Sequence, residues 1–264
     1  MSAIVVDGGL VHYEAFGRGK PVLFLHGWLG SWRYWMRTME EMADKYRTYA
    51  LDLWGFGDSD KSRPRYRLPD YVNLVENFTE NMGIHNAPIV GHSLGASVAI
   101  EYAVQRSQHV PKIIAVSLPM NAACINKRLF DFANNSMLAK MMWWRQLAKE
   151  VQQEAEKTGK DAVNLSVDSV NQVDTLGRIR ALARATDTML LAVYGEKDDI
   201  IDPTPVRDLN GTWPNIRPIG LENSKHFPML EESTKFNRLL RDFLDIEEDL
   251  SALELKEEWR RRTR

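Results

Sequence analysis

The five residues Gly91-His92-Ser93-Leu94-Gly95 decide how the rest of this sequence is interpreted. They lie between a short apolar run at 87–90, which predicts a buried strand, and the segment 96–100, which predicts a helix. Glycines on both sides of Ser93 allow a tight strand-to-helix turn that holds its hydroxyl at the carboxyl end of a sheet, beside a helix N-terminus that favours negative charge. The stretch therefore predicts a serine nucleophile. A structural turn is the alternative, because the five-letter pattern alone also recurs by chance.

Size, charge and cysteine content narrow the class of protein. A chain of 264 residues is long enough for one large α/β domain with an insertion. The net charge of −2, with acids and bases well mixed, implies neither nucleic acid nor an anionic membrane as a partner. The single cysteine, Cys124, excludes an internal disulfide and is typical of a reducing compartment. The start of the chain has no signal-peptide pattern and no apolar run is long enough for a transmembrane segment, so we expect a soluble, cytoplasmic protein.

Apolar runs alternate with helical patterns along most of the chain. Strands are predicted at 4–6, 10–16, 21–25, 49–51, 87–90, 112–118, 189–194 and 216–221. Helices are predicted at 32–46, 69–83, 96–100, 204–209 and 229–244. Such alternation predicts an α/β fold in which a parallel sheet has helices on both faces and the site lies beyond the carboxyl ends of the strands. Six polar residues follow strand ends and are expected to converge there: His26, Asp52, Ser93, Asn121, Asp198 and His226.

The alternation breaks between about 120 and 187, where the pattern is helical throughout. This segment predicts an insertion in a core domain made of residues 1–119 and 188–245, and a helical tail follows at 246–264. An apolar helical face of the insertion is predicted to line a pocket for an acyl or alcohol group, and packing of the insertion against the core is the alternative. The residues predicted to bind substrate are Asn121, Met137, Met141 and Trp144.

A serine hydroxyl is an effective nucleophile only when a base takes its proton and a third group orients that base. Among the six histidines, His226 is the predicted base, because it follows the last predicted strand. His26 lies at the same end of the sheet but in a tight turn, where a structural hydrogen bond is the better interpretation. Asp198 is the predicted acid, in the loop after the strand at 189–194, and Asp199 is the alternative.

Five motifs in this order resemble the α/β-hydrolase superfamily. They are Gly91–Gly95 around Ser93, His26-Gly27 after a strand, Asp52-x-x-Gly55-x-Gly57-x-Ser59, Gly195-x-x-Asp198 and the late His226. The resemblance covers about residues 4–244. It implies a mostly parallel sheet of eight strands, the second of them antiparallel, with a helical lid after the sixth strand, to which residues 120–187 correspond.

The resemblance also assigns an oxyanion hole, formed by the backbone N–H groups of Trp28 and Leu94. One position departs from the family's pattern. Lys225 stands where the family often has a glycine before the histidine. A nearby ammonium group would disfavour the cationic form of His226, unless the lysine side chain points into solvent.

These observations predict a cofactor-independent serine hydrolase, without a metal site, that cleaves a small-molecule carboxylic ester through an acyl-enzyme. Ser93 attacks, His226 transfers the proton and Asp198 orients the imidazole. A serine at this position argues against relatives with an aspartate nucleophile, such as epoxide hydrolases. A C–C bond hydrolase of the same fold and a small-molecule receptor that retains the triad with little turnover are the alternatives. The natural substrate and the oligomeric state stay open.

Overall fold

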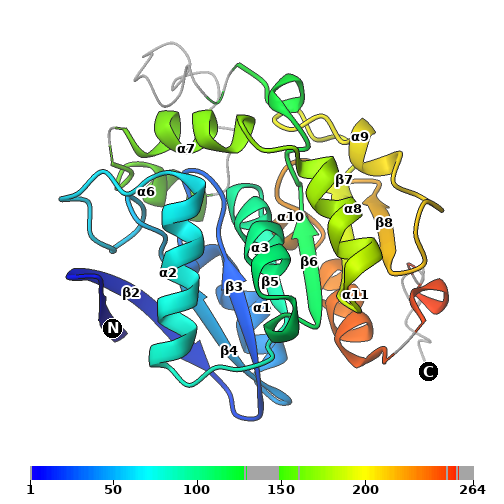
Figure 1. The fold of residues 1–264 in the computed structure, drawn as a ribbon, viewed down its shortest axis with the longest axis horizontal. Coiled ribbons are helices and arrows are strands. Elements are labelled where there is room, and N and C mark those ends of the chain that lie inside the picture. The colour runs from blue at the N-terminus through cyan, green and yellow to red at the C-terminus, as the bar shows by residue number, and fades with distance from the viewer. Residues whose placement is uncertain are drawn as a thin grey trace, which may run out of the picture.

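An eight-stranded sheet runs through the molecule and carries helices on both faces (Figure 1). The computed structural model describes residues 2–127, 129, 149–159, 161–247, 249–253 and 255, and the structural statements below concern these residues. The strand order is β1-β2-β4-β3-β5-β6-β7-β8. The strands are β1 (Ser2–Val6), β2 (Gly9–Phe16), β3 (Lys20–Leu25), β4 (Tyr46–Leu51), β5 (Ile89–His92), β6 (Lys112–Val116), β7 (Met189–Gly195) and β8 (Ile216–Leu221).

The second strand runs against its neighbours. β2 pairs antiparallel with both β1 and β4, whereas the other neighbouring strands pair in parallel. The turn between β1 and β2 has positive φ at Asp7 and Gly8, as expected for a two-residue hairpin whose twist matches that of its strands. The predicted fold class, a mostly parallel eight-stranded sheet with an antiparallel second strand, is therefore confirmed.

Helices cover the two faces of this sheet in separate layers. In Figure 1, α2, α3 and α8 lie on the face toward the viewer, and α1 and α11 lie on the opposite face. None of the described helices combines the length and the apolar character needed to cross a bilayer. The helices are α1 (Met36–Met42), α2 (Leu68–Asn81), α3 (Leu94–Gln105), α6 (Lys149–Ala155), α7 (Ala162–Asn171), α8 (Thr175–Ala185), α9 (Thr204–Arg207), α10 (Pro228–Glu231) and α11 (Ser233–Asp245).

The helix predicted at 32–46 is shorter in the structure. A 3₁₀ turn at Trp32–Trp35 leads into α1, which ends at Met42. The Oγ of Ser31 caps this turn by accepting a hydrogen bond from the N–H of Arg33. Tyr46 already pairs with Lys20 at the start of β3, so the chain must leave the helix before it. Pairing in the sheet therefore overrides the helical spacing of the last residues.

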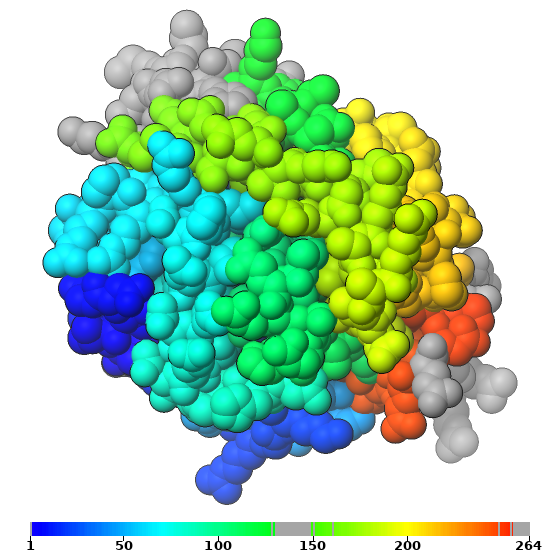
Figure 2. All heavy atoms as spheres, in the orientation of Figure 1, coloured from blue at the N-terminus to red at the C-terminus, as the bar shows by residue number. Residues whose placement is uncertain are grey.

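The segment 120–187 contains α6, α7 and α8. α7 lies across the end of the sheet toward which β6 points, and α8 packs against α3 (Figure 1). An ion pair of 2.9 Å between Arg178 and Glu101 joins α8 to α3. α8 thus serves as the crossover helix that the parallel strands β6 and β7 require. In Figure 2, α7 and α8 form a continuous yellow-green band over this face of the molecule. The assignment of residues 120–187 to a lid separate from the core domain stays a prediction.

The predicted helical tail at 246–264 has a different form in its described part. Leu250–Ala252 form a 3₁₀ turn that contacts β8, and the side chains of Leu250 and Leu253 are buried in the hydrophobic core. Residues 250–252 therefore do not form part of the predicted helix, and the helical tail stays a prediction for the rest of the segment. Residues 256–264 lie outside the described residues.

A lysine from the sheet holds the end of α11. The ammonium group of Lys112, the first residue of β6, donates hydrogen bonds to the carbonyl groups of Phe243 (3.1 Å), Leu244 (2.7 Å) and Ile246. Carbonyl groups in the last turn of a helix have no N–H donor within the helix and need one from elsewhere. A cation at this end also interacts favourably with the helix dipole. Burial lowers the pKa of Lys112. This contact joins the start of β6 to the end of α11.

We predict that Lys112→Met lowers the free energy of unfolding by about 1–3 kcal/mol, because buried carbonyl groups lose a charged donor. Urea denaturation measures this change. Lys149→Met, which alters an exposed lysine in α6, is the matched control and should change stability by less than about 0.5 kcal/mol. Equal effects of the two substitutions would contradict the assigned role of Lys112.

Candidate active site

Ser93 occupies a strained turn between β5 and α3. Its backbone has φ 52° and ψ −111°, in the half of conformational space that L-residues rarely adopt. The flanking glycines make this turn possible, because a Cβ at Gly91 would overlap the carbonyl oxygen of Gly95, and a Cβ at Gly95 would overlap that of Leu25. Holding such a conformation costs about 1–3 kcal/mol, and strain of this kind is concentrated at functional sites.

The hydroxyl of Ser93 has no hydrogen-bond partner among the described residues, although its side chain is fully buried. Such a group normally has a partner, and leaving it without one is costly. Leu94 is the first residue of α3, where backbone N–H groups lack partners within the helix. A Cβ at Gly27 would lie 2.8 Å from the Cβ of Ser93, so the loop that carries Trp28 packs directly against the serine.

Asp198 and His226 are hydrogen-bonded to each other. The Nδ1 of His226 donates to the Oδ2 of Asp198 at 2.9 Å. The other carboxylate oxygen accepts from the N–H groups of Ile200 and Ile201, each at 2.9 Å. Burial by itself raises the pKa of Asp198, but the imidazole and these N–H groups outweigh it and lower the pKa. The carboxylate thus stays charged and orients the imidazole, with the Nδ1 hydrogen directed at Asp198.

The ends of β7 and β8 come close enough to bring this pair together. A Cβ at Gly195 would overlap the carbonyl oxygen of Lys225, so only a glycine allows this approach of the two backbones. The side chain of Lys225 is exposed, as in the solvent-facing interpretation, and its N–H donates to Glu231 at 2.6 Å. The ring of His226 lies 4.7 Å from that of His92, the residue before Ser93.

His26 has the structural hydrogen bonds expected of it. Its Nδ1 donates to the carbonyl of Gly27 at 2.8 Å, and its Nε2 accepts from the N–H of Leu53 at 2.9 Å. Burial lowers the pKa of His26, in agreement with the neutral ring that these bonds require. Both ring nitrogens are occupied, so His26 holds the loop after β3 against the loop after β4.

An apolar cavity lies beside His226. Its described lining consists of Trp28, Leu29, Leu129, Val151, Ile200, His226 and Phe227. The indole N–H of Trp28 donates to the Oγ of Ser166 in α7 at 2.8 Å, which fixes this wall. Ile200 and Phe227 were not among the predicted substrate-binding residues. Ile200 lies two residues after Asp198, and Phe227 directly follows His226. This closeness in the sequence to the predicted acid and base is the signal that could have identified them.

The predicted substrate-binding residues are only partly described. Asn121 is exposed, and its side-chain oxygen caps the following 3₁₀ turn by accepting from the N–H of Cys124 at 3.2 Å. A contact with substrate stays a prediction for this residue. Met137, Met141 and Trp144 lie outside the described residues.

Comparison with known proteins identifies the family. Residues 20–158, more than half of the chain, match the family described as alpha/beta hydrolase fold. The chain belongs to the alpha/beta hydrolase fold family. A solved structure of this fold, a thermophilic esterase from Thermogutta terrifontis, superimposes with a TM-score of 0.78 at 18% identity. The superposition covers 92% of this chain and 98% of that one.

Curated relatives of this alpha/beta hydrolase fold protein have several activities. The dihydrolipoyllysine-residue acetyltransferase component of the acetoin cleaving system of Cupriavidus necator is 28% identical over 90% of this chain and 67% of its own length. The pimeloyl-(acyl-carrier protein) methyl ester esterase of Vibrio campbellii is 24% identical over 88% of this chain and 98% of its own. The chain spans less than half of the soluble epoxide hydrolase of Corynebacterium sp., at 28% identity over 43% of this chain and 40% of that one. The family and the esterases support an enzyme of the hydrolase class.

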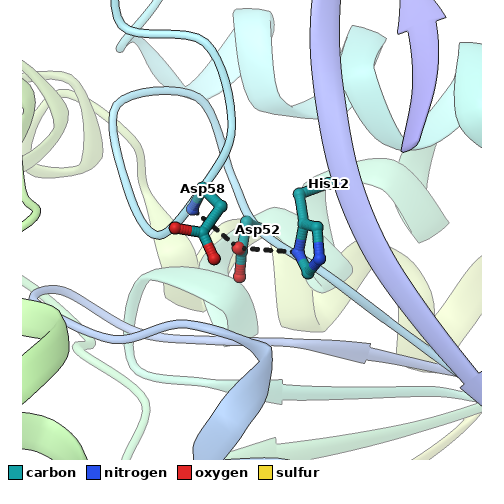
Figure 3. A group of neighbouring side chains, drawn as sticks. All are labelled: His12, Asp52 and Asp58. Carbon is teal, nitrogen blue, oxygen red and sulfur yellow. Dashed lines mark hydrogen bonds and ion pairs between the residues drawn. The ribbon is translucent and has the colours of Figure 1, made fainter. Parts of the chain in front are cut away.

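A second cluster of polar side chains in this alpha/beta hydrolase fold protein surrounds Asp52 (Figure 3). The Oδ2 of Asp52 accepts from the Nδ1 of His12 at 3.1 Å and from the N–H of Asp58 at 2.9 Å. The carboxylate of Asp58 in turn pairs with Arg33 at 2.9 Å and Lys157 at 3.2 Å. His12, Asp52 and Asp58 are near enough to one another for a metal ion, but these oxygens already have donors and two cations lie beside them. The cluster therefore fits a brace for the turn after β4.

The brace predicts a pH dependence of stability. The hydrogen bond to Asp52, which outweighs burial, raises the pKa of His12 above its usual 6.5. Because the folded state then binds the proton more tightly, this contribution is complete below about pH 6.5 and is lost as the pH rises through the folded-state pKa. We expect the difference in unfolding free energy between the native protein and His12→Gln to shrink as the pH rises from 6 to 9. Urea denaturation across this range measures it, and a constant difference would contradict the charged brace.

Proposed function

We propose that the protein is a serine hydrolase that cleaves a carboxylic ester through an acyl-enzyme intermediate. The observation that carries the proposal is the hydrogen bond of 2.9 Å between His226 and Asp198, next to the turn that holds Ser93. A base oriented by a carboxylate is what a serine hydroxyl needs to become a nucleophile. The backbone strain and the unpartnered hydroxyl of Ser93 support the same assignment.

In the proposed reaction, the Oγ of Ser93 attacks the ester carbonyl while the Nε2 of His226 takes its proton. The imidazolium ion that forms is stabilised by Asp198 and returns the proton to the departing alcohol. A water molecule, activated by the same imidazole, then releases the acid and restores Ser93. Backbone N–H groups of Trp28 and Leu94 hold the negatively charged oxygen, and each such donor contributes roughly 3 kcal/mol.

The described part of the cavity beside His226 is small, about 10 Å³, and only the chemistry of its walls supports an apolar group on the substrate. Among its described lining residues, His226 is the only one with an ionisable side chain, and the others are apolar or aromatic. Such walls favour burial of hydrocarbon and give a charged acyl group no partner. The esterases among the relatives and solved structures support ester chemistry. The epoxide hydrolases differ in chemistry, because opening an epoxide through an alkyl-enzyme needs a carboxylate nucleophile where this chain has Ser93.

We predict that Ser93→Ala abolishes hydrolysis of p-nitrophenyl esters and leaves the fold intact, because removal of one hydroxyl opens no large cavity. The native protein should gain a single fluorophosphonate adduct on Ser93, which mass spectrometry of the intact protein and its peptides would locate. Labelling of another serine, or full activity of the alanine variant, would exclude the proposed nucleophile. Negligible turnover of all esters by the native protein would favour a receptor.

We predict that Asp198→Asn lowers kcat by about 10⁴-fold, because an amide favours the wrong tautomer of His226. Asp199→Asn is the matched control and should lower kcat far less. It is the next residue in the same loop, and the imidazole is hydrogen-bonded to Asp198. Steady-state rates on one p-nitrophenyl ester measure both variants. The opposite ranking would assign the acid to Asp199.

A further inference from the structure

A series of buried hydrogen bonds joins the loop after β3, the end of β5 and the loop after β8 at the carboxyl edge of the sheet. The N–H of Gly27, in the loop after β3, donates to the hydroxyl of Tyr34. That hydroxyl lies 3.1 Å from the Nδ1 of His92, the last residue of β5. The Nε2 of His92 lies 2.9 Å from the carbonyl oxygen of His226, in the loop after β8. Tyr34 and His92 are 2% and 0% exposed, so water does not compete for these bonds.

The donor and the acceptor of each hydrogen bond in this series follow from the groups at its two ends, the N–H of Gly27 and the carbonyl of His226. A backbone N–H can only donate and a carbonyl can only accept. The Nε2 of His92 must therefore carry the hydrogen that reaches His226. In the neutral ring, Nδ1 is then an acceptor, and it receives the hydroxyl hydrogen of Tyr34, whose oxygen accepts from Gly27. Donors and acceptors match at each step.

This series of hydrogen bonds depends on a neutral His92 ring. A second proton on its ring would turn Nδ1 into a donor, and the hydroxyl hydrogen of Tyr34 would lose its acceptor. Burial, reinforced by the neighbouring His226, lowers the pKa of His92 well below its usual value. The neutral ring, and with it the pattern of hydrogen bonds, is therefore favoured at neutral pH.

Close packing holds the hydrogen-bonded side chains of Tyr34 and His92 in place. A Cβ at Gly30 would overlap the ring of Tyr34, so the loop after β3 closes tightly on that ring. The ring of Phe227 lies 5.1 Å from that of His92 and 6.1 Å from that of Tyr34. The carbonyl of His226 also accepts a hydrogen bond of 3.1 Å from the hydroxyl of Ser117, in the loop directly after β6.

We propose that Tyr34 and His92 are positioning residues, which set the spacing between the oxyanion loop and the backbone of the general base. This inference rests on the proposed ester hydrolysis. Gly27 immediately precedes Trp28, the proposed oxyanion donor, and His92 immediately precedes Ser93. A bridge through both thus fixes donor and base relative to the nucleophile. Errors of about 1 Å in such an arrangement cost on the order of 10²-fold in rate.

The test uses Tyr34→Phe, His92→Met and the double variant, with kcat and KM measured on a p-nitrophenyl ester. Each single variant should lower kcat by about 10- to 100-fold and change KM by less than about threefold, because misplacement is felt most in the transition state. The double variant should be no slower than the slower single one, since either change breaks the same bridge. His92→Gln should recover part of kcat, because its amide N–H₂ can still donate to the carbonyl of His226.

Tyr102→Phe is the matched control. It also removes a buried tyrosine hydroxyl, bonded to Thr79 at 3.3 Å between α2 and α3, and kcat should stay within about twofold. Circular dichroism at the assay temperature establishes that each variant is folded. If Tyr34→Phe does not fold, the comparison of His92→Gln with His92→Met still decides the question.

Two results would overturn the inference. The first is that folded Tyr34 and His92 variants keep the native kcat and only unfold at a lower temperature. The bridge would then contribute to stability alone. The other is a double variant whose loss equals the product of the single losses, which makes the two side chains independent. Both differ from failure of the proposed function, which activity in Ser93→Ala would reveal.

Discussion

The carboxyl edge of the sheet depends on the close approach of backbones that only glycine allows. Gly91 and Gly95 let the turn at Ser93 fold back on itself, and Gly27 lets the loop after β3 rest on that turn. Gly195 does the same for the loops after β7 and β8. Parallel pairing of β3, β5, β6, β7 and β8 fixes where these loops begin. Hydrogen bonds among the polar side chains then refine a geometry that backbone contact has already set.

The sequence allowed prediction of those features that depend on neighbours along the chain. Apolar runs marked the strands, and 216–221 was predicted with the same limits that β8 has in the structure. The glycine pattern identified the turn at Ser93. The antiparallel second strand came from the family resemblance, and the order of the strands was not predicted, because periodicity alone carries no information about which strands are neighbours.

Features that depend on contacts between distant residues were not predicted. The end of α1 was misjudged because the pairing of Tyr46 with β3 is a property of the sheet. Burial of Leu250 and Leu253 depends likewise on β8, which their own segment does not reveal. No role of its own was predicted for His92. Its ring reaches the hydroxyl of Tyr34 and the carbonyl of His226, and no pattern in the sequence links residues 34, 92 and 226.

The backbone of Ser93 has a consequence for how this fold tolerates change. A glycine adopts positive φ without the steric penalty that serine meets there, so relief of strain at this position would favour a residue without a hydroxyl. The proposed chemistry needs that hydroxyl. Stability and activity therefore make opposite demands on one residue, and a substitution that relieves the strain at position 93 would remove the proposed nucleophile.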